Sequence, residues 1–165
     1  MKKALGLGLI VAVFFAIFVF FQGYIGASAF YLAAITMAMF AVIGPFGNYL
    51  KTGIALLIGV LMGLIGVIIL ATKMPLPPDH LLYLAIVSAI SLFLLVLLST
   101  TGMRIDAMFL GWAGYYAATF GTYITDPSAL GVLALPAAVG VSVSLLVGLV
   151  LSLLVGKIAV AVNQQ

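Results

Sequence analysis

The stretch "TGIALLIGVLMGLIGVIILAT", Thr52–Thr72, lies between Lys51 and Lys73 and contains no charged residue. A helix needs about 20 mainly apolar residues to cross the hydrocarbon core of a bilayer. Backbone groups in that core have no water to bond, so the segment must satisfy its own hydrogen bonds as a helix. The stretch therefore predicts a transmembrane helix with a lysine at each end.

The rest of the chain has the same character. Of its 165 residues, 67% are hydrophobic and 5% are charged, and the mean hydropathy is +1.46. Soluble domains contain about 25% charged residues, so lipid is the solvent that this composition fits. We predict an all-α polytopic membrane protein, a bundle of six transmembrane helices in one domain of residues 1–165. The expected spans are residues 4–21, 24–43, 52–72, 81–100, 107–122 and 127–156.

The few charged residues predict the topology. Six spans place most of the basic residues on one side of the membrane, namely Lys2, Lys3, Lys51, Arg104 and Lys157. Lysines and arginines of short loops stay in the cytoplasm. We therefore expect a multi-pass protein of the plasma or inner membrane with both termini cytoplasmic. On the opposite side, Asp79 and Asp126 are expected to cap the helices that follow them.

Catalytic and cofactor chemistry has little support in the sequence. There is no cysteine, His80 is the single histidine, and the acidic residues number three. We therefore predict no enzyme activity, no catalytic residue, no metal and no cofactor. The basic residues are too dispersed for a nucleic-acid partner, which leaves the lipid bilayer as the expected one.

Small residues recur at helical spacing. Such faces let two helix backbones approach closely in a membrane. The predicted packing residues are Gly59, Gly63, Gly111, Gly114, Gly140 and Gly148. Two interpretations stay open: seams within the bundle, or contacts that build a homo-oligomer or line a narrow pore.

The segment "AMFLGWAGYYAATFGTY", Ala107–Tyr123, is divided into two faces. Its aromatic residues follow helical spacing on one side, and small residues occupy the other. The aromatic stripe either lines a cavity or faces lipid and the headgroup region. Just before it, Arg104 and Asp106 do not share a helix face. They either anchor the surface or serve a solute path.

The turn "GPFGNYLK", Gly44–Lys51, links two apolar segments. Pro45 disfavours helical geometry at Gly44, so a bend is required there. On both sides of this turn, and again in residues 108–140, an aromatic helix leads through a glycine-containing turn into a glycine-bearing helix. This similarity suggests two inverted three-helix halves, an arrangement that transporters use around a central site.

The segment Ala27–Ile65 resembles domain-of-unknown-function family 1097, a family of small bacterial inner-membrane proteins. With this family the resemblance extends over nearly the whole chain. The segment is also similar to the start of the fusaric acid resistance and aromatic acid exporter families. The matching residues are Tyr31, Ala33, Thr36, Pro45, Gly47, Lys51, Gly59 and Gly63. The resemblance implies a prokaryotic multi-spanning membrane protein. The exporters imply efflux of aromatic carboxylates, but this chain lacks their large soluble portion.

Two functions are compatible with these features. The first is a small-solute transporter or channel for organic, aromatic anions, because positive charge at a pore mouth favours anions. The second is a non-transporting scaffold or partner subunit of another membrane complex. The expected substrate path consists of Tyr31, Thr36, Pro45, Phe46, Asn48, Lys51, Arg104, Asp106, Trp112, Tyr116 and Ser144.

Overall fold

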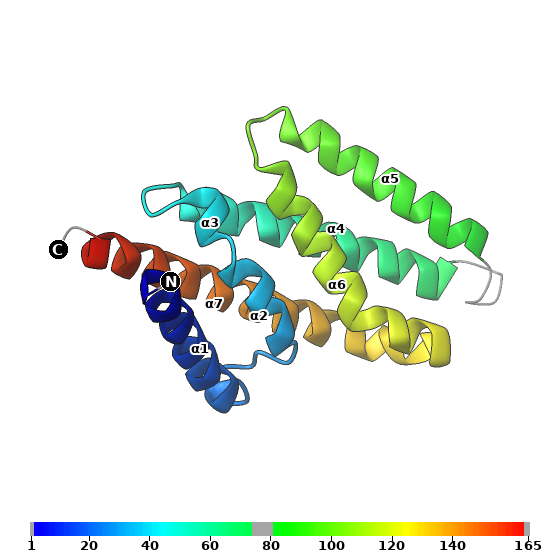
Figure 1. The fold of residues 1–165 in the computed structure, drawn as a ribbon. Coiled ribbons are helices and arrows are strands. Elements are labelled where there is room, and N and C mark those ends of the chain that lie inside the picture. The colour runs from blue at the N-terminus through cyan, green and yellow to red at the C-terminus, as the bar shows by residue number, and fades with distance from the viewer. Residues whose placement is uncertain (1, 74–80, 164–165) are drawn as a thin grey trace. The chain divides into compact units, whose positions relative to one another are not determined.

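The computed structural model describes residues 2–73 and 81–163, and this part of the chain forms helices and turns without a strand. The all-α prediction is therefore confirmed. Asp79 and His80 lie outside the described residues. The elements, shown in Figure 1, are α1 (Lys2–Phe21), α2 (Phe30–Met37), α3 (Phe40–Ile43), α4 (Tyr49–Lys73), α5 (Leu81–Ser99), α6 (Ile105–Thr125), the short 3-10 helix η1 (Pro127–Ala129) and α7 (Leu130–Asn163).

Three of the described helices are long and apolar enough to cross a membrane. They are Tyr49–Lys73, Leu82–Ser99 and the segment Pro127–Val162. They overlap the predicted spans 52–72, 81–100 and 127–156, and the last of them extends six residues further. The entry into the last one is capped as predicted: the Asp126 carboxylate accepts bonds from the backbone N–H groups of Ser128 and Ala129. These helices are compatible with a location in a membrane.

The structure differs from the predicted span 24–43. Residues 22–29 form turns, and helix α2 begins only at Phe30. Gly26 has φ +71°, a conformation that L side chains rarely adopt and that glycine permits. The helix is interrupted again after Met37, where the Met39 N–H bonds to the Thr36 carbonyl three residues back, at 3.1 Å. A helix of normal pitch would bond four residues back, so the chain winds more tightly there.

The chain divides into two compact units. Unit 1 comprises Met1–Tyr49 and Val143–Gln165, and unit 2 comprises Leu50–Ser142. Helix α7 contributes its first part to unit 2 and its part from Val143 onward to unit 1. These units are not the two consecutive halves of the suggested inverted repeat, which stays a prediction.

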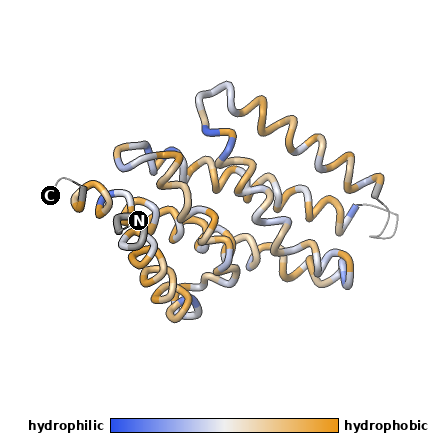
Figure 2. The backbone as a smooth tube through the Cα atoms, in the orientation of Figure 1, coloured by the Kyte–Doolittle hydropathy of each residue, from blue (hydrophilic) through white to orange (hydrophobic). Residues whose placement is uncertain are grey.

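Helix α5 in unit 2 buries a single stripe. Val87, Ser91 and Leu95 lie four residues apart and are buried, whereas Ile90 is 55% and Phe93 62% exposed. Figure 2 shows that α5 is hydrophobic along most of its length. A helix that is apolar all round needs an apolar environment on every side. The exposed apolar faces of α5 are compatible with a lipid environment.

Unit 1 has its own core around Phe18 of α1. This residue lies with buried Ala27 and Ala33, and the cluster includes Val143 and Val147 of α7.

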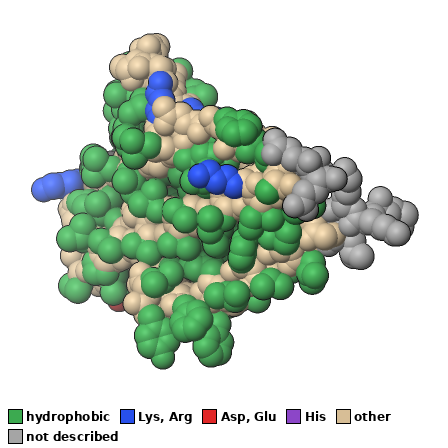
Figure 3. Space-filling view, turned by 90° about the vertical axis from the view of Figure 1, so that its left-hand side faces the viewer, with side chains coloured by type: hydrophobic (Ala, Val, Ile, Leu, Met, Phe, Trp, Pro, Cys, Tyr) green, Lys and Arg blue, Asp and Glu red, His purple; other side chains and the backbone are tan. Residues whose placement is uncertain are grey.

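The end of α1 carries exposed aromatic residues, with the rings of Phe21 and Tyr24 6.2 Å apart. Hydrophobic side chains also cover most of the face seen in Figure 3. An aromatic cluster between apolar helices and a turn is typical of the headgroup level of a membrane.

Candidate functional site

Helices α4 and α6 of unit 2 cross at two glycines. A Cβ atom on Gly59 would overlap the Met108 carbonyl oxygen, and one on Gly111 would overlap the Leu56 carbonyl oxygen. The two backbones are therefore in direct contact, as small residues allow in membrane helices. Gly59 and Gly111 are two of the predicted packing glycines. Their contacts fix the position of α6, and therefore of its aromatic residues, along the length of α4.

One turn further along α4, Gly63 lies against Tyr115. A Cβ on Gly63 would meet Tyr115 Cβ at 3.2 Å. Tyr115 is fully buried, and its hydroxyl donates to the Ala134 carbonyl at 3.0 Å. Tyr115 is not among the residues that the sequence patterns predicted for the site. Its spacing of four residues from Gly111 places it on the packing face, and that spacing was the available signal.

The aromatic stripe of α6 brings two polar groups into the interior of unit 2. The rings of Trp112 and Tyr116 lie 4.4 Å apart between centroids, tilted by 37°. Trp112 Nε1 and the Tyr116 hydroxyl are both buried, and neither has a hydrogen-bond partner among the described residues. We call these two groups the donor pair. Ser152 Oγ in unit 1 is the third such atom.

The Tyr116 hydroxyl lies where α4, α5 and α6 meet. A Cβ on Gly66 of α4 would sit 2.6 Å from this hydroxyl, 3.3 Å from Val87 and 3.6 Å from Ser91 Oγ of α5. Ser91 donates its own proton to the Val87 carbonyl at 2.7 Å. The Ser88 side chain of α5 lies within reach of the Tyr116 hydroxyl, but the geometry between the two groups is not that of a hydrogen bond. Gly66 thus provides the space that the hydroxyl needs.

A buried donor without a partner costs about 1–3 kcal/mol. Indole N–H is a donor only, and a phenol can donate as well as accept. The donor pair is therefore suited to a group with acceptor oxygens, such as a carboxylate or a carbonyl. The adjacent rings also offer an apolar surface on which a planar group can stack.

Charged residues gather at one end of unit 2. Lys51, in the first turns of α4, places its Nζ 3.4 Å from the Cβ position of Gly102, in the turn between α5 and α6. Beyond that turn, Arg104 Nε donates to Asp106 Oδ1 at 3.1 Å, and a second bond joins Arg104 Nη2 to Oδ2. The sequence did not predict this pair, because residues two apart do not share a helix face. Arg104 instead precedes α6 with extended geometry, φ −74° and ψ 110°.

The ion pair shifts the protonation of its acid. The hydrogen bonds from Arg104 lower the pKa of the Asp106 carboxyl below its usual value, and partial burial opposes that shift. The side chains of Arg104 and Asp106 are 30% and 46% exposed, so water screens the attraction.

We expect Asp106→Asn to lower the free energy of unfolding at neutral pH by less than about 1 kcal/mol. A carboxyl with a lowered pKa in the fold stabilises the protein above its unfolded pKa, and this contribution is lost as pH falls through the folded pKa. The wild type should therefore lose this small contribution on acidification, and the variant should not. Unfolding by SDS in dodecylmaltoside, followed by circular dichroism, measures both. A much larger loss would contradict a solvent-screened pair.

In unit 1, the turn that begins at Gly44 is held in place. Gly44 has φ +71°, and its carbonyl accepts a bond from the Tyr49 hydroxyl at 3.0 Å. Pro45 lies near the Cβ position of Gly156, at 3.5 Å. The Phe46 side chain, however, is 89% exposed. The bend predicted at Pro45 is present, and its aromatic residue faces outward.

The other path residues divide between the units. Thr36 of unit 1 is buried beside Gly148 and donates to the Ala33 carbonyl at 3.3 Å. Ser144 is buried in the same unit, whereas Tyr31 is half exposed. In unit 2, Trp112 lies next to Tyr116. Lys51 lies next to the turn that precedes the Arg104–Asp106 pair. Asn48, another residue of the expected path, lies in the turn before α4. Two further packing glycines are buried, Gly114 on α6 and Gly140 on α7.

The resemblance suggested by Ala27–Ile65 stays a prediction. Comparison with protein-family models, curated proteins and solved structures finds no match for this chain.

Proposed function

We propose that this chain is a multi-spanning membrane protein that binds and moves a small organic anion, and that the donor pair of unit 2 is its solute site. The observation that carries the proposal is the pair of buried, unpartnered donors, Trp112 Nε1 and the Tyr116 hydroxyl, on adjacent rings of one helix. Native proteins leave few buried polar groups unbonded, and each such group calls for an explanation. A solute oxygen that accepts from both groups provides one.

The proposed solute is an aromatic carboxylate. Its oxygens would accept from the donor pair, and its ring would stack on the indole or the phenol. Lys51 and Arg104 supply positive charge at one end of the same unit. Positive groups at the mouth of a pathway favour anions over cations, although Asp106 offsets part of this charge.

The proposed arrangement is a six-span bundle with both termini in the cytoplasm. Unit 2 supports it, because Lys51 at the start of α4 meets the turn between α5 and α6. These residues share one end of the unit, as the alternating direction of α4, α5 and α6 requires. Short-loop basic residues stay on the cytoplasmic side, so this end is assigned to the cytoplasm.

We expect Tyr116→Phe to weaken binding of benzoate by at least about tenfold, since a hydrogen bond to a charged group contributes about 1.5–3 kcal/mol. Trp112 is the single tryptophan of the chain, so its fluorescence reports on the site directly. Titration of the protein in nanodiscs with benzoate gives the dissociation constant. Uptake of labelled benzoate into proteoliposomes, compared with empty vesicles, tests transport.

Tyr24→Phe provides the matched control. Tyr24 is strongly exposed at the end of α1, so removing its hydroxyl should leave benzoate binding and uptake unchanged. Benzamide, which keeps the ring but not the charge, tests the preference for an anion. The proposal fails if benzoate changes neither Trp112 fluorescence nor vesicle uptake. It also fails if Tyr24→Phe and Tyr116→Phe weaken binding equally.

A further inference from the structure

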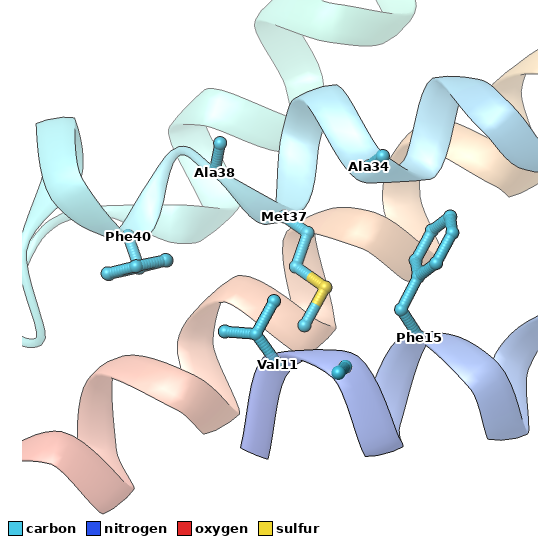
Figure 4. A pocket seen from close by; sticks show the side chains of 7 residues that line it. Val11, Phe15, Ala34, Met37, Ala38 and Phe40 are labelled. Carbon is cyan, nitrogen blue, oxygen red and sulfur yellow. The ribbon is translucent and has the colours of Figure 1, made fainter. Parts of the chain in front are cut away.

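Unit 1 contains a cavity between α1 and the segment formed by α2 and α3. Its volume is about 260 Å³. We call it the hairpin groove. Figure 4 shows side chains from both sides of it, among them Val11 and Phe15 of α1 and Ala34, Met37, Ala38 and Phe40 of the other segment.

Small side chains and the interrupted helix create this space. Ala34 and Ala38 lie four residues apart and both line the groove. The tight turn after Met37 then carries Phe40 beyond them, as Figure 4 shows. Phe15 borders the groove on the α1 side. Two alanines thus leave a gap that the larger side chains frame.

The chemistry of the groove is uniform. Every residue that lines it is apolar, with no charged or hydrogen-bonding side chain. A water molecule would find no hydrogen-bond partner there, whereas a buried water needs two to four of them. A carboxylate would lose its hydration without compensation. The groove therefore takes a hydrocarbon, which is a different class of ligand from the solute proposed for Trp112 and Tyr116.

The groove is also open to the outside. Ala34 and Ala38 are exposed, whereas Met37 between them is buried. On α1, Ala12 lines the groove and is exposed, and the lining residues Val11 and Phe15 are partly exposed. If the bilayer surrounds α1, these residues contact lipid tails. The groove is then continuous with the hydrocarbon phase.

Markers at the two ends of α1 place the groove at the depth of the lipid tails. The exposed aromatic residues Phe20, Phe21 and Tyr24 lie at one end, as expected at a headgroup level. The sequence places Lys2 and Lys3 at the other end, where basic residues meet anionic headgroups. Val11 and Phe15 lie between these markers along the helix.

We propose that the hairpin groove binds one acyl chain of a bilayer phospholipid. The proposal rests on the membrane location in the proposed function but not on the solute site. Its occupant follows from the apolar lining, the open side and the depth between the aromatic and basic ends of α1. A bound chain restores the contacts that the two alanines do not make with α1.

Filling the groove tests the proposal. Protein from phosphatidylglycerol nanodiscs is transferred to detergent and analysed by native mass spectrometry for retained phospholipid. We expect the wild type to retain one phospholipid per chain and Ala38→Phe to retain none. Ala41→Phe is the matched control, because Ala41 is exposed nearby but does not line the groove. It should retain the lipid.

Ala34→Leu provides a second, milder filling variant, and circular dichroism checks that each variant is helical. The proposal is overturned if the wild type retains no phospholipid, or if folded Ala38→Phe or Ala34→Leu retains it as the wild type does. Benzoate titration of Trp112 in the same preparations separates the two proposals. Retained lipid without benzoate binding would contradict the solute site alone, and benzoate binding without retained lipid would contradict the groove alone.

Discussion

Replacing Gly111 with alanine is expected to lower the free energy of unfolding by about 3 kcal/mol, as overpacking a close contact does. The added Cβ would overlap the Leu56 carbonyl oxygen and would come within 3.1 Å of the Val60 nitrogen. Both are backbone atoms of α4, so no side chain can rotate away. The helices must separate, and the neighbouring contact of Gly59 with Met108 would be lost with them.

Gly121→Ala on the same helix is the matched control. A Cβ at Gly121 has no neighbouring atom within 4 Å, and alanine favours a helix over glycine by about 1 kcal/mol. The control should therefore be neutral or stabilising. SDS titration in dodecylmaltoside, followed by circular dichroism, measures both variants. If Gly111→Ala is as stable as Gly121→Ala, the close crossing of α4 and α6 is wrong.

The sequence predicted best the helices whose ends carry charge. Helix α4 runs from Tyr49 to Lys73, so the predicted span 52–72 misses it by three residues at the start and one at the end. Charged residues resist burial in lipid, which is why the lysines mark the ends of the apolar segment. Nothing comparable marks residues 22–29. Ala27 and Ala29 in that turn are buried, so their apolar character fits a folded turn as well as a helix. Hydropathy alone does not distinguish the two.

The candidate site was predictable only in part. Helical spacing placed Trp112 and Tyr116 on one stripe. Whether their polar atoms find partners depends on α4 and α5, which pack against them from other parts of the chain. The hairpin groove depends in the same way on how the segment of Ala34 and Ala38 packs against α1. Spacing predicts which residues share a helix face, but only packing decides what that face meets.

Small residues recur every four positions on α7, at Gly140, Ser144, Gly148, Ser152 and Gly156. This spacing fits packing inside the bundle, a contact between subunits or the lining of a narrow pore. Gly148, near the centre of this series, is buried in unit 1. A Cβ there would overlap Thr36 Oγ1 and the Ala33 carbonyl oxygen, and would lie 2.8 Å from Ala33 Cα. This position is occupied by α2 of the same chain, so it is not a surface for a scaffold contact. The scaffold alternative would need another face.

Gly148→Leu is therefore expected to disrupt unit 1 itself, with a loss of at least about 3 kcal/mol in the free energy of unfolding. Hydrogen exchange should locate the damage, because α2 loses the surface on which Ala33 and Thr36 pack, while α6 in unit 2 keeps its contact with α4. Gly131→Leu on the same helix is the control, since a Cβ there meets nothing within 4 Å. If Gly148→Leu leaves the protection of α2 unchanged and instead releases a stoichiometric membrane partner, the small residues of α7 serve that partner and the scaffold function is favoured over transport.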